Sequence, residues 1–436
     1  MNNVCPKKMP ALCKSQGSWS LLIVVLATLS IDGCGGGGGG GSSMSTPPPP
    51  PVGSIANLKT MQTLGSTMAS NGDVNPYGLA TPPASYTGTA TSVLQPGDIL
   101  ISNFSDSTGA IAGKTVMRYA LASGQISLFS TNNVGTGPVA LAIGPTGFPW
   151  IANYQVGYIN PADGASTGDG NELIVTPDGT VLSPNIGIID NNSGATFDPS
   201  QATFAGPWGE IWTQPADGST GHFFISEVNT GWVQRQEIPA GALPSATHLV
   251  TIGQLPVGSN AFDPTGPQGM AYDAQRDILY VASTADNSIV AFPAASTATA
   301  SFNSGSVVFS GTPLNAPVGL TLNPLNGNLI AVNQLDNKMV EIAPNPSTPT
   351  TGGGGGGGSY STMMTMAAST QAVAAASALV FSGKLIATKL LDTTVVDAQA
   401  GTGSALFGVL AVKDSNNNLL VYYTNSNTNT LNVLKQ

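Results

Sequence analysis

The chain has 436 residues, of which only 8% are charged, and its 23 acidic and 13 basic side chains give a net charge of −10. Its 54 glycines and 32 prolines exclude long amphipathic helices and coiled coils, which are rich in Glu, Lys and Leu. The scarcity of lysine and arginine excludes nucleic acid as a partner, because neutralising phosphates requires a basic face. An apolar content of 41% suffices for a buried core, so we expect a folded, all-β chain.

The amino terminus has the layout of an export signal. Three lysines precede an apolar run from Trp19 to Leu29, which is followed by Cys34 and then polyglycine. The run is about half the length that a membrane-spanning helix needs, so we interpret residues 1–33 as a signal peptide. Residues 34–53, which combine polyglycine with polyproline, are predicted to form a flexible tether.

Gly33 directly before Cys34 resembles the lipobox of bacterial lipoproteins, although Asp32 stands where that family usually has Ser or Ala. The resemblance implies that Cys34 becomes the acylated first residue and attaches the protein to a membrane. Because Gly35, not aspartate, follows the cysteine, it also implies the bacterial outer membrane, in a periplasmic or surface-exposed position. Simple secretion after cleavage nearby is the alternative.

From about residue 75 one unit recurs six times. It begins with Pro-x-Gly and an apolar strand, continues through a turn into a second strand that ends in a small polar residue, and then adds further strands. The clearest copies begin at Gly266 and Ala316, and the others begin near Pro76, Pro138, Pro207 and Leu406. Short alternating strands bounded by Asn-Gly and Asp-Gly turns indicate antiparallel hairpins.

These repeats, above all "DILYVASTADNSIVAF" within the copy from Gly266, resemble the NHL and YVTN-type repeat propellers of the gluconolactonase- and TolB-like group. The resemblance implies a six-bladed β-propeller of four-stranded antiparallel blades over residues 54–436. It does not imply one activity, because this frame carries scaffolds, ligand binders, lactonases and lyases.

Two irregularities of the repeat lead to further predictions. The sixth unit has only three strands before the chain stops at Gln436, so we expect the early segment Ser54 to Gly65 to supply its outer strand and close the circle. Residues 345–382 interrupt the fifth unit with polyglycine, a methionine-rich patch and an alanine-rich run. They are predicted to be a low-complexity insertion, with a partner-binding arm as the alternative.

Aligning the ends of the second strands places one polar residue from each repeat at the same level. We call these residues the polar ring: Asn103, Asn153, Glu227, Ser283, Asn333 and Asn425. In the family resembled, this level opens onto the ligand-binding face, so the ring is a candidate ligand site. Its oxygen atoms suit a hard cation such as calcium, and the resemblance implies Glu227 as a metal ligand. The competing interpretation is that these residues are turn formers whose side chains bond to nearby backbone.

Covalent and acid-base chemistry is poorly represented in the mature sequence. It has two histidines, His222 and His248, both beside apparent strands, and no catalytic serine or zinc motif. The tryptophans of the second and third units are expected in the core, although a pair of them could stack on a sugar or an aromatic ligand. No catalytic residue is predicted.

The function predicted from the sequence is a ligand- or protein-binding module, or a scaffold, at the bacterial cell envelope, held by an acyl anchor on Cys34. Its partner is expected to be an envelope protein or a small molecule. The alternative is a divalent-metal-dependent hydrolase or lactonase of the gluconolactonase-like type, with Glu227 and the asparagines of the polar ring as ligands.

Overall fold

The computed structural model describes residues 53–89, 92–131, 136–154, 170–182, 188–189, 206–213, 220–239, 249–260, 264–348 and 379–436. The predicted signal peptide and nearly all of the predicted tether lie outside these residues. None of the helices within the described ranges is long and apolar enough to cross a membrane.

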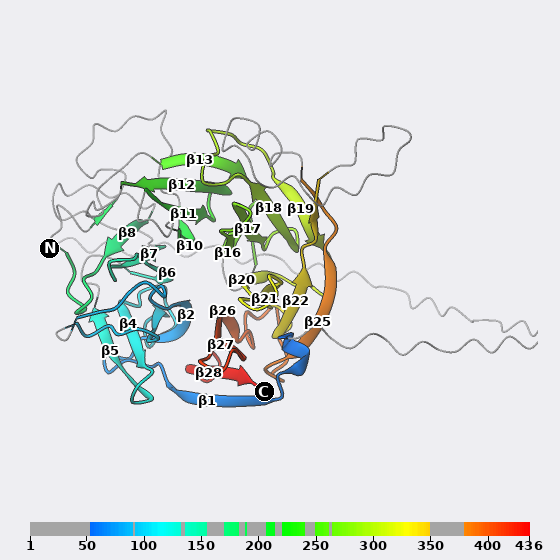
Figure 1. The fold of residues 1–436 in the computed structure, drawn as a ribbon. Coiled ribbons are helices and arrows are strands. Elements are labelled where there is room, and N and C mark those ends of the chain that lie inside the picture. Colours follow the sequence, from blue (N-terminus) through cyan, green and yellow to red (C-terminus); the bar gives the residue numbers. More distant parts are fainter. Residues whose placement is uncertain are drawn as a thin grey trace, which may run out of the picture. The chain divides into compact units, whose positions relative to one another are not determined.

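The described residues form six four-stranded antiparallel sheets arranged as the blades of a propeller (Figure 1). The first three blades contain β2 (Val74–Ala80), β3 (Ile99–Ser105), β4 (Thr115–Ala120) and β5 (Gln125–Thr131); β6 (Pro138–Ile143), β7 (Pro149–Asn153), β8 (Asn171–Ile174) and β9 (Ile188–Ile189); and β10 (Pro207–Thr213), β11 (Gly221–Glu227), β12 (Trp232–Ile238) and β13 (Leu249–Gln254). The last three contain β16 (Pro267–Asp273), β17 (Ile278–Ser283), β18 (Ser288–Pro293) and β19 (Ser306–Ser310); β20 (Pro317–Leu322), β21 (Leu329–Asn333), β22 (Lys338–Ala343) and β25 (Lys384–Leu390); and β26 (Leu406–Lys413), β27 (Leu419–Asn425), β28 (Thr430–Lys435) and β1 (Thr60–Ser66). A short ribbon of β14 (Gly258–Ser259) and β15 (Pro264–Thr265) precedes the fourth blade. The predicted fold class is confirmed.

The sixth blade is closed by the start of the propeller chain. Strand β1 pairs antiparallel with β28, the last strand, and gives the sheet order β1-β28-β27-β26. The segment predicted to fill this place is therefore the one that does so. Pairing the two ends of the propeller within one blade leaves no gap at which the ring of sheets could open.

A buried carboxylate fixes the segment that leads into β1. Glu341 of β22 accepts hydrogen bonds from the hydroxyl of Ser54 at 2.6 Å, from the backbone N–H of Ile55 at 2.8 Å and from the amide of Asn328 at 2.8 Å. These bonds hold the short helix η1 (Ile55–Asn57) against the fifth blade. Because Glu341 is fully buried and its partners are all donors, it serves a structural role.

The glycine of the repeated Pro-x-Gly motif allows the innermost strands to approach one another. A Cβ on Gly209 would overlap the carbonyl oxygen of Gln268 in the next blade, and a Cβ on Gly408 would overlap that of Tyr77. The pairing of each innermost strand is interrupted by a bulge just after the repeat's first residue. Only glycine or another small residue fits at this position, which explains why the motif recurs along the sequence.

In the first, third and sixth blades, a hydroxyl side chain of the second strand links neighbouring innermost strands. In the third blade, Ser226 accepts a hydrogen bond from Gly209 N–H and donates one to the carbonyl of Gln268, both at 2.8 Å. Ser102 and Thr424 occupy the same position in the first and sixth blades. These bonds satisfy backbone groups that the bulges leave without a sheet partner.

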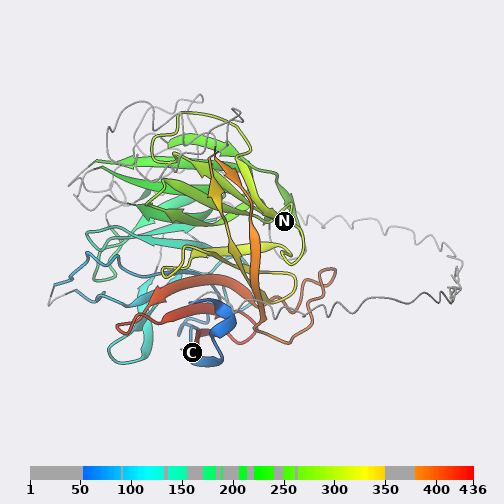
Figure 2. The same cartoon turned by 45° about the vertical axis from the view of Figure 1, so that its right-hand side comes forward.

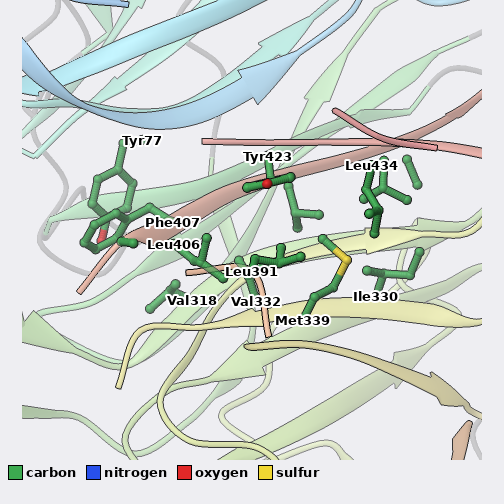
Figure 3. Packing of buried hydrophobic residues seen from close by; sticks show 14 of the residues in the cluster. Tyr77, Val318, Ile330, Val332, Met339, Leu391, Leu406, Phe407, Tyr423 and Leu434 are labelled. Atoms are coloured by element: carbon green, nitrogen blue, oxygen red, sulfur yellow. The ribbon is translucent and has the colours of Figure 1, made fainter. Parts of the chain in front are cut away.

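The core consists of apolar clusters between successive blades, one of which is drawn in Figure 3. There, Ile330 and Met339 of the fifth blade pack toward Leu434 of the sixth. Alternate residues of each strand face opposite neighbouring blades, so both faces of the second strands are buried and these strands are mostly apolar, whereas outer strands such as β1 and β25 are largely exposed.

The insertion of the fifth blade leaves the sheet at β22 and returns at β25, as the repeat alignment predicts. Figure 2 shows β25 as the long orange strand at the outer edge of the propeller. The two ends of the insertion pair as β23 (Pro346–Ser347) and β24 (Val380–Phe381). The stretch 349–378 lies outside the described residues, so its predicted low-complexity or partner-binding character stays a prediction.

Candidate functional site: the axial cavity and its glutamate pair

The strand register confirms that the polar ring is a set of equivalent positions. In five blades the ring residue ends the second strand and pairs with the residue that begins the innermost strand, for example Glu227 with Pro207. In the first blade Asn103 pairs with Pro76 in the same way, but both strands continue for two more residues. The same pairing holds in the other four blades. All six ring residues are buried.

The ring amides are used mainly in local bonding. Asn103 donates to the carbonyl of Thr67 at 2.9 Å, Asn333 donates to the carbonyl of Pro313 at 2.8 Å, and Asn425 donates to a carboxylate oxygen of Asp392 at 2.7 Å. These bonds tie the strand ends to adjoining loops, as expected of turn-forming residues. The oxygens Oδ1 of Asn103, Oδ1 of Asn333 and Oγ of Ser283 are buried without a hydrogen-bond partner among the described residues, and the ligand-binding role of the ring stays a prediction.

Aromatic residues fill the axis at the level of the ring. Tyr77, Trp208 and Phe407, each the second residue of an innermost-strand repeat, meet Phe104 and Tyr154, which follow ring asparagines; we call these five residues the axial plug. Ring centroids lie 4.3 Å apart for Tyr77 and Phe407, 5.4 Å for Tyr77 and Trp208, and 5.6 Å for Phe104 and Trp208. Figure 3 shows Tyr77 and Phe407 against each other. The plug occupies the place that a ligand at the ring would need.

Glu227 does not belong to a cluster of acidic, histidine or cysteine ligands within the described residues. Within the described ranges, no three or more His, Cys, Asp or Glu side chains are grouped so that they could hold a metal ion. The ring asparagines contribute their amide nitrogens to local bonds, as described above. Glu227 as a metal ligand, which the family resemblance implies, therefore stays a prediction, and we derive no chemical step through a metal.

Below the plug, the innermost strands of all six blades surround an axial cavity of about 490 Å³. Tyr77, Trp208 and Phe407 form its closed end. The other end is formed by the loops that follow the innermost strands, where Ser85 and Ala274 are exposed to solvent. The cavity is within the usual size range of small-molecule sites, and its wall is mostly apolar and aromatic.

One carboxyl side chain in this wall departs from the repeat. Glu210 of β10 lines the cavity and is only 8% exposed. The register places apolar residues at the equivalent position of the other five blades: Leu79, Leu141, Met270, Leu320 and Val409. A glutamate in a position that the fold fills with an aliphatic side chain is not required by the propeller architecture.

Its partner is also an exception to the repeat. Glu172 of β8, in the second blade, is fully buried, and its carboxyl lies close enough to that of Glu210 for the two to interact electrostatically. Here too the equivalent residues of the other five blades are apolar: Val116, Val233, Ile289, Met339 and Leu431. Two unrelated core positions have thus become acidic where they meet across one interface between blades.

The electrostatics of this glutamate pair keep a proton in the interface. Burial raises the pKa of Glu172 to about 7. Burial also raises the pKa of Glu210 well above its usual range, and the negative charges of Glu172 and then Glu227 add to that shift. Two buried carboxylates without a basic partner repel each other, so the protonated form of at least one of them is favoured. Near neutral pH the pair is therefore a proton-holding acid in a cavity wall.

Tryptophans surround this part of the cavity. Trp212 follows Glu210 by two residues, also lines the cavity, and packs against Trp150 and Phe223 at centroid distances of 5.8 Å in both cases. The indole N–H groups of Trp208 and Trp212 have no hydrogen-bond partner among the described residues. The predicted clustering of tryptophans in the second and third units is thus observed, and two of the tryptophans lie in a cavity wall.

The remaining residues singled out in the sequence contribute less. His222 is half-buried at the start of β11, and burial, followed by the positive charge of Arg235, lowers its pKa. His248 lies outside the described residues. The sequence prediction did not include Glu172 or Glu210, although an alignment of third strands and of innermost strands would have shown each as the single acid in an otherwise apolar column.

Comparisons with known proteins identify no family for this chain. No family model matches the chain, and no curated protein matches it by sequence. Among solved structures, similar chains include one in a nidogen/laminin complex (15% identity, 62% of this chain and 76% of that one, TM-score 0.38) and a gluconolactonase from Xanthomonas campestris (11%, 86% and 89%, 0.45). Another is a putative oxidoreductase (glucose dehydrogenase) from Thermus thermophilus (12%, 86% and 99%, 0.44). The class defined here is the six-bladed β-propeller.

Proposed function

We propose that this protein is an exported ligand-binding propeller whose axial cavity receives a small molecule. The observation that carries the proposal is the glutamate pair, which replaces two aliphatic core positions where they meet beside a cavity that ends in exposed loops. Burying two carboxyls without a basic partner lowers stability. Residues that lower the stability of the fold and have no role in maintaining it are typical of functional sites.

The export part of this proposal rests on the sequence. The signal-peptide layout of residues 1–33 and the lipobox-like Gly33-Cys34 support acylation of Cys34 and a tethered position at the outer membrane. A tether of about 20 flexible residues spans roughly 25 Å, which would hold the propeller clear of the membrane surface. Secretion without a lipid anchor is the alternative, and partitioning of the protein into detergent distinguishes the two.

Blocking the cavity mouth tests the binding role. A panel of small amines, alcohols, sugars and aromatic acids is screened by ligand-observed NMR against the wild type and the Ala274→Trp variant. Ala274 is exposed at the cavity mouth, whereas Ala122→Trp places the same side chain on an exposed hairpin of the first blade and serves as the matched control. We expect hits whose affinity falls at least tenfold in the first variant only. Equal binding by all three proteins would place the ligand site elsewhere.

A hydrolase is the second candidate, because a carboxyl pair that shares one proton can act as general acid and general base. This function requires turnover as well as binding. Hydrolysis of simple lactones is measured with the wild type and Glu210→Gln, in the presence and in the absence of calcium. A rate that is lost in the variant would favour the enzyme, and a rate equal to background would favour the binding module.

A further inference from the structure

The axial cavity has a single sign of charge. Of the residues that line it, Glu210 is the one with an ionisable acidic or basic side chain, and no lysine, arginine or histidine is among them. The charged groups that act on Glu210 from the neighbouring strands are Glu172 on β8 and Glu227 on β11, and both are acidic. On β6, the backbone of Ala142 approaches Glu210 as a hydrogen-bond donor. β6, β8 and β10 carry no lysine, arginine or histidine, and His222 lies at the opposite end of β11 from Glu227, where burial lowers its pKa and so favours its neutral form.

The carboxyl oxygens of Glu210 are also not satisfied by side-chain donors. No N–H of another described side chain donates to them. Both oxygens are buried, so the carboxyl lies behind the cavity wall, in the interface between the blades, and its side chain must turn toward the cavity to meet a ligand. A buried carboxylate is stabilised by a cation much more than by a neutral donor. The cavity wall therefore has one place at which a positive charge is strongly favoured.

The remaining wall suits the body of an organic cation. Trp208, Trp212, Tyr77 and Phe407 present aromatic rings to the cavity. Aromatic faces attract ammonium groups and also bury apolar carbon, so the same surface serves both ends of an amphipathic amine. A volume of about 490 Å³ accommodates such a molecule but not a peptide chain. The net charge of −10 further favours the approach of cations over anions.

We propose that the axial cavity selects a small organic cation, an amine or quaternary ammonium with an apolar body, whose charged group pairs with Glu210. This assignment rests on the proposed ligand-binding function and specifies its ligand class. Binding ionises the glutamate pair, so one proton leaves the pair as the cation arrives. Affinity therefore rises with pH through the range in which the pair is otherwise protonated, because the cation and the proton compete.

A pair of matched probes tests the assignment. Isothermal titration at pH 8 and low salt compares 2-phenylethylamine, which is cationic, with 2-phenylethanol, which is neutral and nearly the same shape. We expect the amine to bind at least tenfold more tightly than the alcohol, and its affinity to fall at least fivefold at pH 5.5. The heat measured in buffers of different ionisation enthalpy should show net proton release.

Variants identify the residue responsible. Glu210→Gln should bring the affinities for the amine and for the alcohol within twofold of each other. If Glu210→Gln does not fold, the same comparison is made with Glu210→Leu, because leucine occupies the equivalent position in three other blades. Glu237→Gln removes the same charge from an exposed position of the same blade and should change neither affinity. Equal affinities for amine and alcohol in the wild type would overturn the cation assignment while leaving the cavity as a ligand site. Failure of the amine to bind would overturn it as well, and the Ala274→Trp comparison then decides the binding function separately.

Discussion

Replacing the glutamate pair by the residues of the other blades should stabilise the protein at neutral pH. The double variant Glu172→Val and Glu210→Leu restores side chains found at the equivalent positions, Val116 and Leu141 among them, so the interface between the second and third blades can pack as its counterparts do. Replacing buried polar pairs with well-packed apolar residues typically leaves stability unchanged or increases it by about 1 to 4 kcal/mol.

The expected magnitude follows from the proton that the pair holds. In the unfolded chain Glu172 has its ordinary pKa of 4.5, and in the folded protein burial raises the pKa to about 7. Below pH 4.5 the group is protonated in both states and costs nothing. As the pH rises past 7 the unfolded state gains from ionisation, and the folded state loses about 3 kcal/mol in relative stability, since each tenfold change in proton affinity corresponds to about 1.4 kcal/mol.

Urea unfolding followed by tryptophan fluorescence measures this difference. Wild type and double variant should differ by at least about 3 kcal/mol at pH 8, because the raised pKa of Glu210 adds to the contribution of Glu172, and by much less at pH 4, with the wild type losing stability relative to the variant as the pH rises above about 4.5. A difference that does not change with pH would show that the pair holds no proton. A variant less stable than the wild type at pH 8 would refute the reasoning altogether, because it would mean that the two acids stabilise the interface.

Three further substitutions test other parts of the account. Gly209→Ala should destabilise the propeller by about 1 to 3 kcal/mol in the same urea assay, because its Cβ meets backbone of the next blade, whereas Gly144→Ala, whose Cβ meets only ordinary contacts, should be close to neutral. Glu341→Ala should lower the melting temperature by several degrees and increase proteolysis of the first strand, since it removes the acceptor that fixes the closing segment; unchanged proteolysis would argue against that role. Cys34→Ser should move the exported protein from the detergent phase to the aqueous phase and abolish labelling by a fatty-acid probe, and a wild type that is itself aqueous would favour secretion.

Much of the architecture could be predicted from the sequence because local signals repeat. The Pro-x-Gly start recurs in four units and in altered form in the other two, and turn residues separate the strands. A missing fourth strand in the last unit leaves one consistent place for the segment from Ser54 to Gly65. The equivalence of the polar ring was likewise predictable, because it depends on strand ends that turn residues mark. These features are determined by the sequence within one unit or by the order of the units along the chain.

The glutamate pair could not be predicted in the same way, because it depends on contacts between units. Glu172 and Glu210 lie 38 residues apart in the least regular part of the repeat, and their proximity arises only when the second and third blades pack. The axial plug likewise depends on contacts between units. Tyr77 lies in the first unit of the sequence and Phe407 in the last, and they meet only because the first and sixth blades are neighbours in the closed propeller. A polar residue stands out in sequence, whereas aromatic residues that fill the axis look like ordinary core.

A crystal structure of the protein purified without chelators, with anomalous data and with crystals soaked in 2-phenylethylamine, tests the central claim most directly. The account predicts the amine in the axial cavity, its nitrogen within hydrogen-bonding distance of Glu210, with the axial plug in place and the asparagines of the polar ring bonded to their loops. An empty cavity together with a metal ion on Glu227 at the ring, and a displaced plug, would contradict it and favour the metal-dependent hydrolase.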